Sequence, residues 1–201
     1  MAALSQTTTD RQLWQQLKSG SELALGKLLA KYFNLLQNYG FKFVREENFV
    51  KDCVQEVFIE IWNRREQIST PESVRAYLLS CVRRRVLRES DRQHIIKEAW
   101  PVDLENDSNF VEFSPEWSVI EQESLAETTH RIADVLNRLP KRQREAIYLR
   151  FYQNLERDEI AVIMGVNAQS VSNLLQAAFK SFRENWVGLV TWVFFLGYIV
   201  F

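Results

Sequence analysis

The sequence predicts an all-α protein made of two small helical domains joined by a flexible acidic linker. Apolar residues recur at spacings of three and four, which places them on one face of a helix, and no strand-like alternation appears. With 46% hydrophobic and 25% charged residues among 201, the chain can fill two small cores and remain dissolved. We expect domains at residues 10–98 and 125–185, a linker at 99–124 and an apolar tail at 186–201.

The first domain is expected to consist of four helices. Asp10 is the predicted cap of a short helix, and Ser21 caps a longer one that continues to about residue 44. A third helix covers about residues 48–65 and has a wide apolar surface. Pro71 suits the first position of a fourth helix, which runs to about residue 93 and ends strongly basic.

The second domain ends in the pattern of a helix-turn-helix. Its helices are expected at about residues 116–137, 140–153, 156–164 and 167–184. Pro140 opens the second of these, because proline lacks the N–H that a first helical position leaves unpaired. Gly165 permits a tight turn between the last two helices, and Asn167 caps the final one.

The net charge of −1 conceals an uneven distribution of charge. Residues 99–130 contain eight acids and no lysine or arginine. By contrast, the basic residues between positions 68 and 97 are Arg75, Arg83, Arg84, Arg85, Arg88, Arg92 and Lys97. Such a helix suits phosphate groups, although a helix C-terminus also favours arginine through the macrodipole.

Catalytic and metal-binding patterns are missing from the sequence. Cys53 and Cys81 lie inside helical patterns and lack the paired spacing of a zinc site or a disulfide framework. His94 and His130 lie near no nucleophile or metal-ligand set, so we expect no enzyme, no metal and no cofactor. The first ten residues lack the features of a signal peptide, which favours a reduced cytoplasmic setting.

The helix-turn-helix presents a polar face. Its second helix carries Gln169, Ser170, Ser172, Asn173 and Gln176, at positions where a major-groove reader contacts bases. Upstream, Arg142 and Arg144 suit phosphates, which position a protein without specifying sequence. An ordinary helical hairpin with a solvated face is the alternative.

One side of the third helix offers hydrogen-bond acceptors. Asp52, Gln55 and Glu56 recur at spacings of three and four and suit basic residues of a partner. Phe58 and Trp62 of the same helix are either core or interface residues. The alternative is that the acids are solvated charges and the aromatic residues are plain core.

Three segments together resemble sigma factors of the extracytoplasmic-function type. Residues 139–145, with Glu159-Ile160-Ala161, Gly165-Val166 and Ser170-Val171 after them, resemble region 4 of that family. Residues 52–62 resemble region 2, and residues 74–88 resemble its promoter-melting helix. The resemblance covers about residues 10–93 and 125–184, in the family's order.

The resemblance implies a factor that directs RNA polymerase to promoters. The implied polymerase-binding residues are Asp52, Gln55, Glu56, Phe58 and Trp62. The implied minus-10 contacts are Gln67, Ser69 and Thr70, which line a pocket for one extruded base, and Arg75, Arg83, Arg84, Arg88 and Arg92. The implied minus-35 contacts are Arg142, Arg144, Gln169, Ser170, Ser172, Asn173, Gln176 and Lys180.

The partners that the resemblance implies are core RNA polymerase, promoter DNA and an anti-sigma factor. A stand-alone helix-turn-helix regulator is the alternative, but such a protein needs neither the acceptors of the third helix nor a melting helix. The family often carries arginine or lysine where this chain has Ser172, Leu174 and Ala177. We therefore expect region 4 to bind DNA weakly by itself.

Two segments leave alternatives open. The acidic linker is a solvated spacer or, as in the family, a segment that enters the polymerase active cleft. Residues 186–201 carry no charge and as a helix reach about 24 Å, short of a hydrocarbon core of about 30 Å. This tail packs into a groove on protein or associates with a membrane, in a factor otherwise expected in the cytoplasm.

Overall fold

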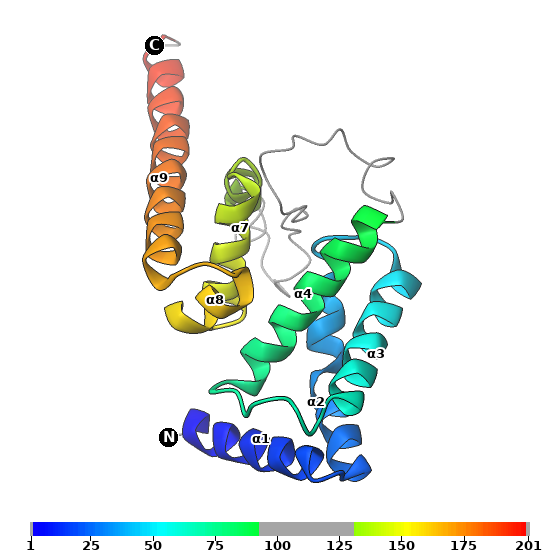
Figure 1. The fold of residues 1–201 in the computed structure, drawn as a ribbon. Coiled ribbons are helices and arrows are strands. Elements are labelled where there is room, and N and C mark those ends of the chain that lie inside the picture. The colour runs from blue at the N-terminus through cyan, green and yellow to red at the C-terminus, as the bar shows by residue number, and fades with distance from the viewer. Residues whose placement is uncertain (1, 93–130, 200–201) are drawn as a thin grey trace.

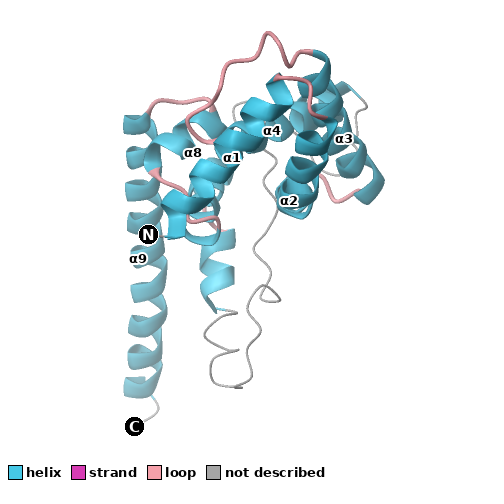
Figure 2. Ribbon diagram, turned by 90° about the horizontal axis from the view of Figure 1, so that it is seen from below, coloured by secondary structure: helices cyan, strands magenta, loops and turns pink. Residues whose placement is uncertain are grey.

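The computed structural model describes residues 2–92 and 131–199, with side chains placed for residues 10–92 and 131–185. Every regular element in these ranges is a helix, as Figure 2 shows. The expected all-α fold with two helical parts is therefore confirmed. The acidic linker predicted at residues 99–124 lies outside the described residues.

Two helices open the chain, and they are α1 (Ala2–Lys18) and α2 (Glu22–Gly40). α1 begins well before Asp10, so the prediction that Asp10 caps it is wrong. Asp10 is buried instead and accepts hydrogen bonds from Lys31 and Tyr32 of α2. Ser21 caps α2 as predicted, because its hydroxyl oxygen accepts from the Ala24 N–H at 3.3 Å.

Two further helices complete the first module, and they are α3 (Glu47–Asn63) and α4 (Val74–Arg92). The prediction that Pro71 takes the first position of the fourth helix is wrong, since α4 begins only at Val74. Ser73 is the residue that satisfies the helix start, because its hydroxyl oxygen accepts from the Ala76 N–H at 3.2 Å.

Residues 131–137 are helical and lead into the elements α7 (Lys141–Ile147), η2 (Tyr148–Tyr152), α8 (Arg157–Met164) and α9 (Ala168–Ile199). η2 is a single π-helical turn that continues α7. Gly165 ends α8 with φ of 66°, and the Asn167 side chain accepts from the Ser170 N–H at 2.7 Å to cap α9. α8 and α9 thus form the predicted helix-turn-helix.

α9 is longer than the sequence suggested. We predicted its end near residue 184, but it continues to Ile199, so residues 186–199 of the apolar tail prolong the second helix of the helix-turn-helix. No proline interrupts the chain after Asn167, and no capping signal near residue 184 ends the hydrogen-bonded ladder. Over the described ranges, no helix is both long enough and apolar enough to cross a membrane.

The two modules pack against each other. In Figure 1, α2, α3 and α4 run alongside one another, α1 lies across one end of them, and α8 rests against α4. Helices α2 and α3 approach closely at Gly40, where a Cβ atom would lie 2.5 Å from Cγ1 of Val50. The buried side chains of both modules belong to one hydrophobic cluster, although we expected separable domains.

Candidate polymerase and nucleic-acid interfaces

One side of α3 forms an exposed surface that we call the acidic face, and its residues are Asp52, Gln55, Glu56, Ile59 and Glu60. The structure exposes all three acceptors predicted to bind polymerase. Ile59 is 58% exposed between them. The sequence prediction missed it, although its spacing of three and four from the predicted acceptors was a usable signal. An apolar centre with a polar rim is typical of a protein–protein interface.

The two aromatic residues predicted to bind polymerase lie elsewhere on α3. Phe58 is only 4% exposed and packs in the core, which does not agree with direct contact to a partner. Trp62 is half-buried, and the guanidinium of Arg65 lies over its ring at 4.6 Å from the centroid. α3 packs against both α2 and α4, and this two-sided burial explains its wide apolar surface.

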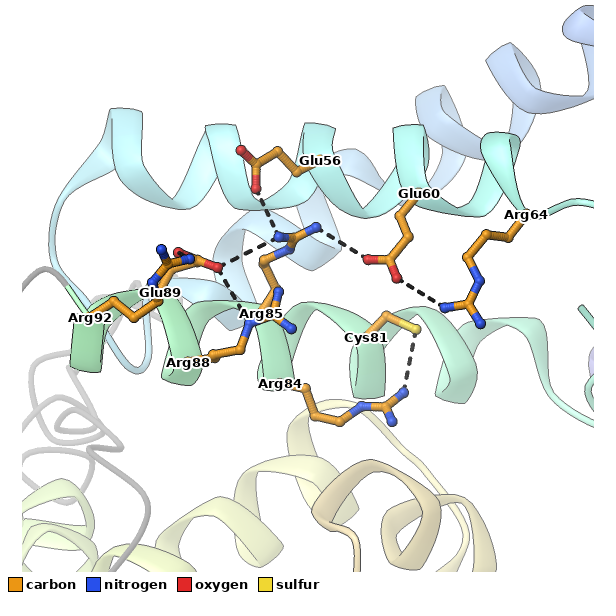
Figure 3. Close-up of polar contacts among 9 residues, drawn as sticks. All are labelled: Glu56, Glu60, Arg64, Cys81, Arg84, Arg85, Arg88, Glu89 and Arg92. Carbon is orange, nitrogen blue, oxygen red and sulfur yellow. Dashed lines mark hydrogen bonds and ion pairs between the residues drawn. The ribbon is translucent and has the colours of Figure 1, made fainter.

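Arg85 connects the acidic face to α4. Its guanidinium lies 3.2 Å from a carboxylate oxygen of Glu56, 3.2 Å from one of Glu60 and 3.6 Å from one of Glu89, as Figure 3 shows. The Arg85 side chain is only 17% exposed, so water screens these ion pairs incompletely. Arg85 therefore holds α3 against α4 and is not free to bind a phosphate.

Arg84, Arg88 and Arg92 form an exposed basic row along α4. They are spaced by four residues and so lie on one side of the helix. Arg88 and Arg92 each lie 3.4 Å from a carboxylate oxygen of Glu89. Exposed pairs of this kind contribute roughly 0–1 kcal/mol, so a DNA phosphate can readily replace the carboxylate.

A pocket of about 430 Å³ opens beside the basic row. Its walls come from α3, from α4 and from the loop between them, and include Arg64, Ile68, Tyr77, Cys81, Arg84 and Arg88. Burial raises the pKa of the Cys81 thiol, so this wall of the pocket is a neutral thiol at neutral pH. An aromatic ring beside several guanidinium groups suits a nucleobase and its phosphate.

The loop of residues 64–73 joins α3 to α4 and carries the residues predicted to hold an extruded base. Gln67 and Ser69 are exposed, and Thr70 is half-buried. The Ser69 carbonyl oxygen accepts a hydrogen bond from the indole N–H of Trp14 at 3.2 Å. One edge of the loop is thus attached to α1, a contact that the sequence did not suggest.

Arg75 and Arg83 were predicted to contact minus-10 DNA, but both face the second module. Arg83 is 9% exposed and donates from Nε and Nη2 to Glu145, at 2.7 and 3.2 Å. Glu145 is fully buried and also accepts from the Tyr39 hydroxyl at 2.7 Å. Arg75 donates to the Gln153 side chain at 2.7 Å. Direct DNA contact by either arginine does not agree with this arrangement.

These five residues, Tyr39, Arg75, Arg83, Glu145 and Gln153, form what we call the inter-module contact. Burial lowers the pKa of Arg83, but the Glu145 carboxylate more than offsets this and raises it above its usual value. Burial and the nearby Glu145 charge raise the pKa of Tyr39 well above its usual value. The Arg83 guanidinium is therefore positively charged and the Tyr39 phenol is a neutral donor at physiological pH.

α9 carries an exposed polar row, whose residues are Gln169, Asn173, Gln176 and Lys180. Their spacing of four, three and four places them on one side of the helix. The Gln169 amide donates to the Asn173 side-chain oxygen at 3.0 Å, which aligns two amide groups in the first turns. Ser170 and Ser172, also predicted to contact bases, are half-buried.

The two arginines predicted to meet minus-35 phosphates differ in access. Arg142 is half-buried, whereas Arg144 is buried at 9% exposure, which does not agree with direct phosphate contact in this arrangement. The neighbouring Glu145 lies on the inward side of α7 as well. In the part of the chain that the structure describes, no group of three acid, histidine or cysteine side chains is placed to hold a metal ion.

The fold is that of a two-module helical protein with a helix-turn-helix, the class to which many DNA-binding proteins belong, and its acidic face, basic row and polar row are separate exposed surfaces. The family model described as Sigma-70 region 2 matches residues 28–94, and the one described as Sigma-70, region 4 matches residues 129–182. The chain belongs to the sigma-70 family of RNA polymerase sigma factors, in its extracytoplasmic-function subfamily.

Individual proteins agree with this assignment. The ECF RNA polymerase sigma factor BldN of Streptomyces coelicolor is 27% identical over 181 residues, which cover 90% of this chain and 67% of BldN. RNA polymerase sigma factor CnrH of Cupriavidus metallidurans is 27% identical over 175 residues, which cover 84% of this chain and 90% of CnrH. RNA polymerase sigma factor SigV of Bacillus subtilis is 26% identical over 143 residues, which cover 71% of this chain and 79% of SigV.

Solved structures show the same fold. CnrH in complex with the cytosolic domain of CnrY matches with a TM-score of 0.55 at 20% identity, over 87% of this chain and 95% of CnrH. The sigma factor RpoE of Bartonella quintana, in complex with the anti-sigma factor NepR, matches with a TM-score of 0.53 at 15% identity, over 80% of this chain and 94% of RpoE.

Membership of this family gives the protein its function. It joins core RNA polymerase and directs promoter-specific initiation, with region 2 at the minus-10 element and region 4 at the minus-35 element. Sigma factors are transcription initiation factors and not enzymes. Because polymerase and promoter DNA are its partners, its place of action is the cytoplasm.

Proposed function

We propose that this sigma factor binds core polymerase through the acidic face of α3, holds the minus-10 strand on the basic row of α4 and reads the minus-35 element with the polar row of α9. The proposal rests on which of the predicted site residues have exposed side chains and which are buried. These three surfaces are exposed while the modules are in contact, whereas Phe58 is buried in the core and Arg83 is paired with Glu145 until the modules separate. Three partners can therefore bind three separate surfaces of one chain.

The pocket beside the basic row is the proposed receptor for the extruded minus-10 base. Tyr77 offers a ring for stacking, and Arg84 and Arg88 lie where the phosphates on either side of the base would pass. Gln67 and Ser69 do not line the pocket, but they are exposed in the adjoining loop, of which Arg64 and Ile68 form part of the wall, and they offer hydrogen-bonding groups there. Extrusion costs a few kcal/mol of stacking, which these contacts offset.

Promoter reading requires that the two modules separate. The minus-10 and minus-35 elements are centred about 25 base pairs apart, which is about 85 Å of duplex at about 3.4 Å per base pair. In the arrangement described here, which we call the closed form, Arg83 of α4 is bonded to Glu145 of α7 at 2.7 and 3.2 Å, so the two modules cannot reach both elements at once. The closed form is therefore the form of the factor before it engages a promoter.

An anti-sigma factor is a proposed partner of this chain. Support comes from the RpoE relative of the same fold, which was solved with the anti-sigma factor NepR. The inter-module contact gives such a partner a simple mode of action: a protein that bridges both modules would hold the closed form. The ratio of its affinities for the closed and open forms would decide how strongly it inhibits promoter binding.

The apolar tail supports a separate proposal, contact with a membrane surface or with a partner protein. Residues 186–201 carry no charge, and residues 186–199 continue α9. Fractionation of cells that express the full chain or residues 1–185 distinguishes the two. Equal solubility of both proteins contradicts membrane association, and pull-down of a partner by the full chain alone supports protein contact.

Run-off transcription with purified core polymerase and a promoter library tests the assignment of the three rows. The wild type should give specific starts, and the variants Glu56→Ala, Arg88→Gln and Asn173→Ala should fail at core binding, strand opening and minus-35 preference respectively. A wild type that neither binds core nor gives specific starts contradicts the whole proposal. If all three variants fail at the same step, the assignment of one step to each surface is wrong.

A further inference from the structure

α1 carries a buried aromatic residue that contacts the base-binding loop. Trp14 is fully buried, and its indole Nε1–H donates to the Ser69 carbonyl oxygen at 3.2 Å across 55 residues of sequence. Its ring meets the ring of Tyr77 edge to face, with centroids 5.3 Å apart. One side chain thus touches both the loop of residues 64–73 and a wall of the 430 Å³ pocket.

The loop needs such an attachment because it has little regular hydrogen bonding of its own. No residue between Asn63 and Val74 is helical, and the exposed residues of this loop are Arg64, Glu66, Gln67, Ser69 and Glu72. The backbone bonds in its first half run from Gln67 and Ile68 back to the Arg64 carbonyl, at 2.9 and 3.1 Å. The Trp14 bond holds the half of the loop that follows.

α1 itself is held firmly on the module. Leu17, one turn beyond Trp14, is fully buried, and the buried Asp10 accepts a 2.5 Å hydrogen bond from the Tyr32 hydroxyl of α2. Both residues precede position 28, where the match to region 2 begins. A rigid helix outside the matched region therefore supports the loop inside it.

We propose that Trp14 is a positioning residue for minus-10 recognition: it fixes the Ser69 carbonyl and the Tyr77 ring, and so sets the shape of the pocket that selects the extruded base. The inference rests on the proposed function, since it takes the loop and the pocket as the receptor of that base. Preorganised loops select ligands better because binding does not have to order them. Loss of one neutral hydrogen bond should weaken this selection about three- to tenfold.

The test uses the full-length protein with core polymerase and promoter duplexes that carry 2-aminopurine at each minus-10 position in turn. Fluorescence reports which base leaves the stack, and competition among the four natural bases at that position gives the discrimination. Trp14→Phe keeps a ring but removes the donor. A second variant with benzothienylalanine at position 14 replaces only the N–H by sulfur and keeps the shape of the side chain.

We expect both variants to bind core within twofold of wild type and to lose base discrimination about three- to tenfold. Leu17→Ala is the matched control: it removes buried packing from the same helix and should lower the unfolding temperature without changing discrimination. Position-14 variants that keep discrimination within twofold overturn the inference and leave the proposed function standing. Variants that lose core binding as well overturn it in favour of a general structural role.

A wild type that extrudes no minus-10 base overturns the proposed function and this inference together. That outcome is recognised from the wild type alone, before any variant is compared. A wild type that extrudes a base normally, with unaltered discrimination in both position-14 variants, refutes only the role of Trp14.

Discussion

Arg83 and Glu145 form a buried two-bond ion pair between α4 and α7. The guanidinium Nε and Nη2 lie 2.7 and 3.2 Å from the two carboxylate oxygens, and the Glu145 side chain has no exposed surface. Removing one partner of such a pair typically costs about 3–5 kcal/mol, because a charge remains buried without compensation. The attachment of the two modules therefore depends strongly on this pair.

Glu145→Gln should open the protein. Glutamine keeps the size of the side chain and can still accept from Tyr39, but it leaves the Arg83 charge uncompensated. Separation of the modules lets Arg83 regain water, so we expect a larger radius of gyration by small-angle X-ray scattering. Glu156→Gln is the matched control, because Glu156 pairs with Arg150 at 2.8 Å with 75% of its side chain exposed.

The same scattering experiment can contradict this account. An unchanged radius of gyration for Glu145→Gln means that the pair does not decide closure. The double variant Arg83→Met with Glu145→Leu should restore the closed form, since apolar residues of similar volume can replace a buried pair without loss.

Lys42 should report opening through its titration. Burial, and then the charge of Arg45, lower the pKa of Lys42 to about 8, and its ammonium lies 5.8 Å from the ring centroid of Tyr148 in the second module. Between this value and about 10.4, the unfolded chain binds more protons, so the Lys42 contribution makes the free energy of unfolding rise with pH. In Glu145→Gln we expect the Lys42 pKa, measured by NMR, to move up toward its usual value. No movement in an open variant would mean that closure is not what buries Lys42.

Arg84→Gln and Arg88→Gln should each weaken minus-10 binding by the holoenzyme in a salt-dependent manner. Each phosphate contact that is lost should reduce the slope of log K against log salt by about 0.7 to 0.9. Arg11→Gln, at an exposed position on α1, is the control and should leave the slope unchanged. If the slopes of Arg84→Gln and Arg88→Gln equal those of wild type and Arg11→Gln, the basic row does not contact the DNA phosphates.

Gln55→Ala together with Glu56→Ala should weaken core polymerase binding. The pair lies on the exposed acidic face, so unfolding measured by circular dichroism should change by less than about 1 kcal/mol, although Glu56 also pairs with Arg85 at 3.2 Å. Asp134→Ala removes an exposed acid from the second module and serves as the control. Undiminished core binding by the double variant would refute the acidic face as the binding surface.

Asn173→Ala should relax the preference for one base at the minus-35 element. A well-placed amide contact to a base is worth about 1–3 kcal/mol of discrimination, and Asn173 is exposed in the first turns of α9. Glu184→Gln lies further along the same helix and should leave the preference intact. An equal loss across all sequences in binding selection would assign Asn173 to phosphate contact instead.

Local chemistry in the sequence determined most of the helices and their caps. Ser21, Gly165 and Asn167 act as predicted because capping involves a side chain and backbone groups only a few residues away. Pro71 and Ser73 show the limit of the same reasoning, since both are acceptable starts for α4 and the structure uses the serine. Spacing also placed Asp52, Gln55 and Glu56 on one exposed side of α3, but it missed Ile59, and it did not show that Ser170 and Ser172 of α9 are half-buried.

The tertiary structure decided which charged residues remain available. Arg83 and Arg84 are neighbours of the same residue type, yet one is buried against Glu145 and the other is exposed. Successive residues on a helix point about 100° apart, so the direction of the partner module determines the role of each. That partner lies 62 residues away from Arg83, beyond the reach of any local pattern. The sequence by itself therefore determined the helices and their faces, and only packing between the modules determined which faces meet.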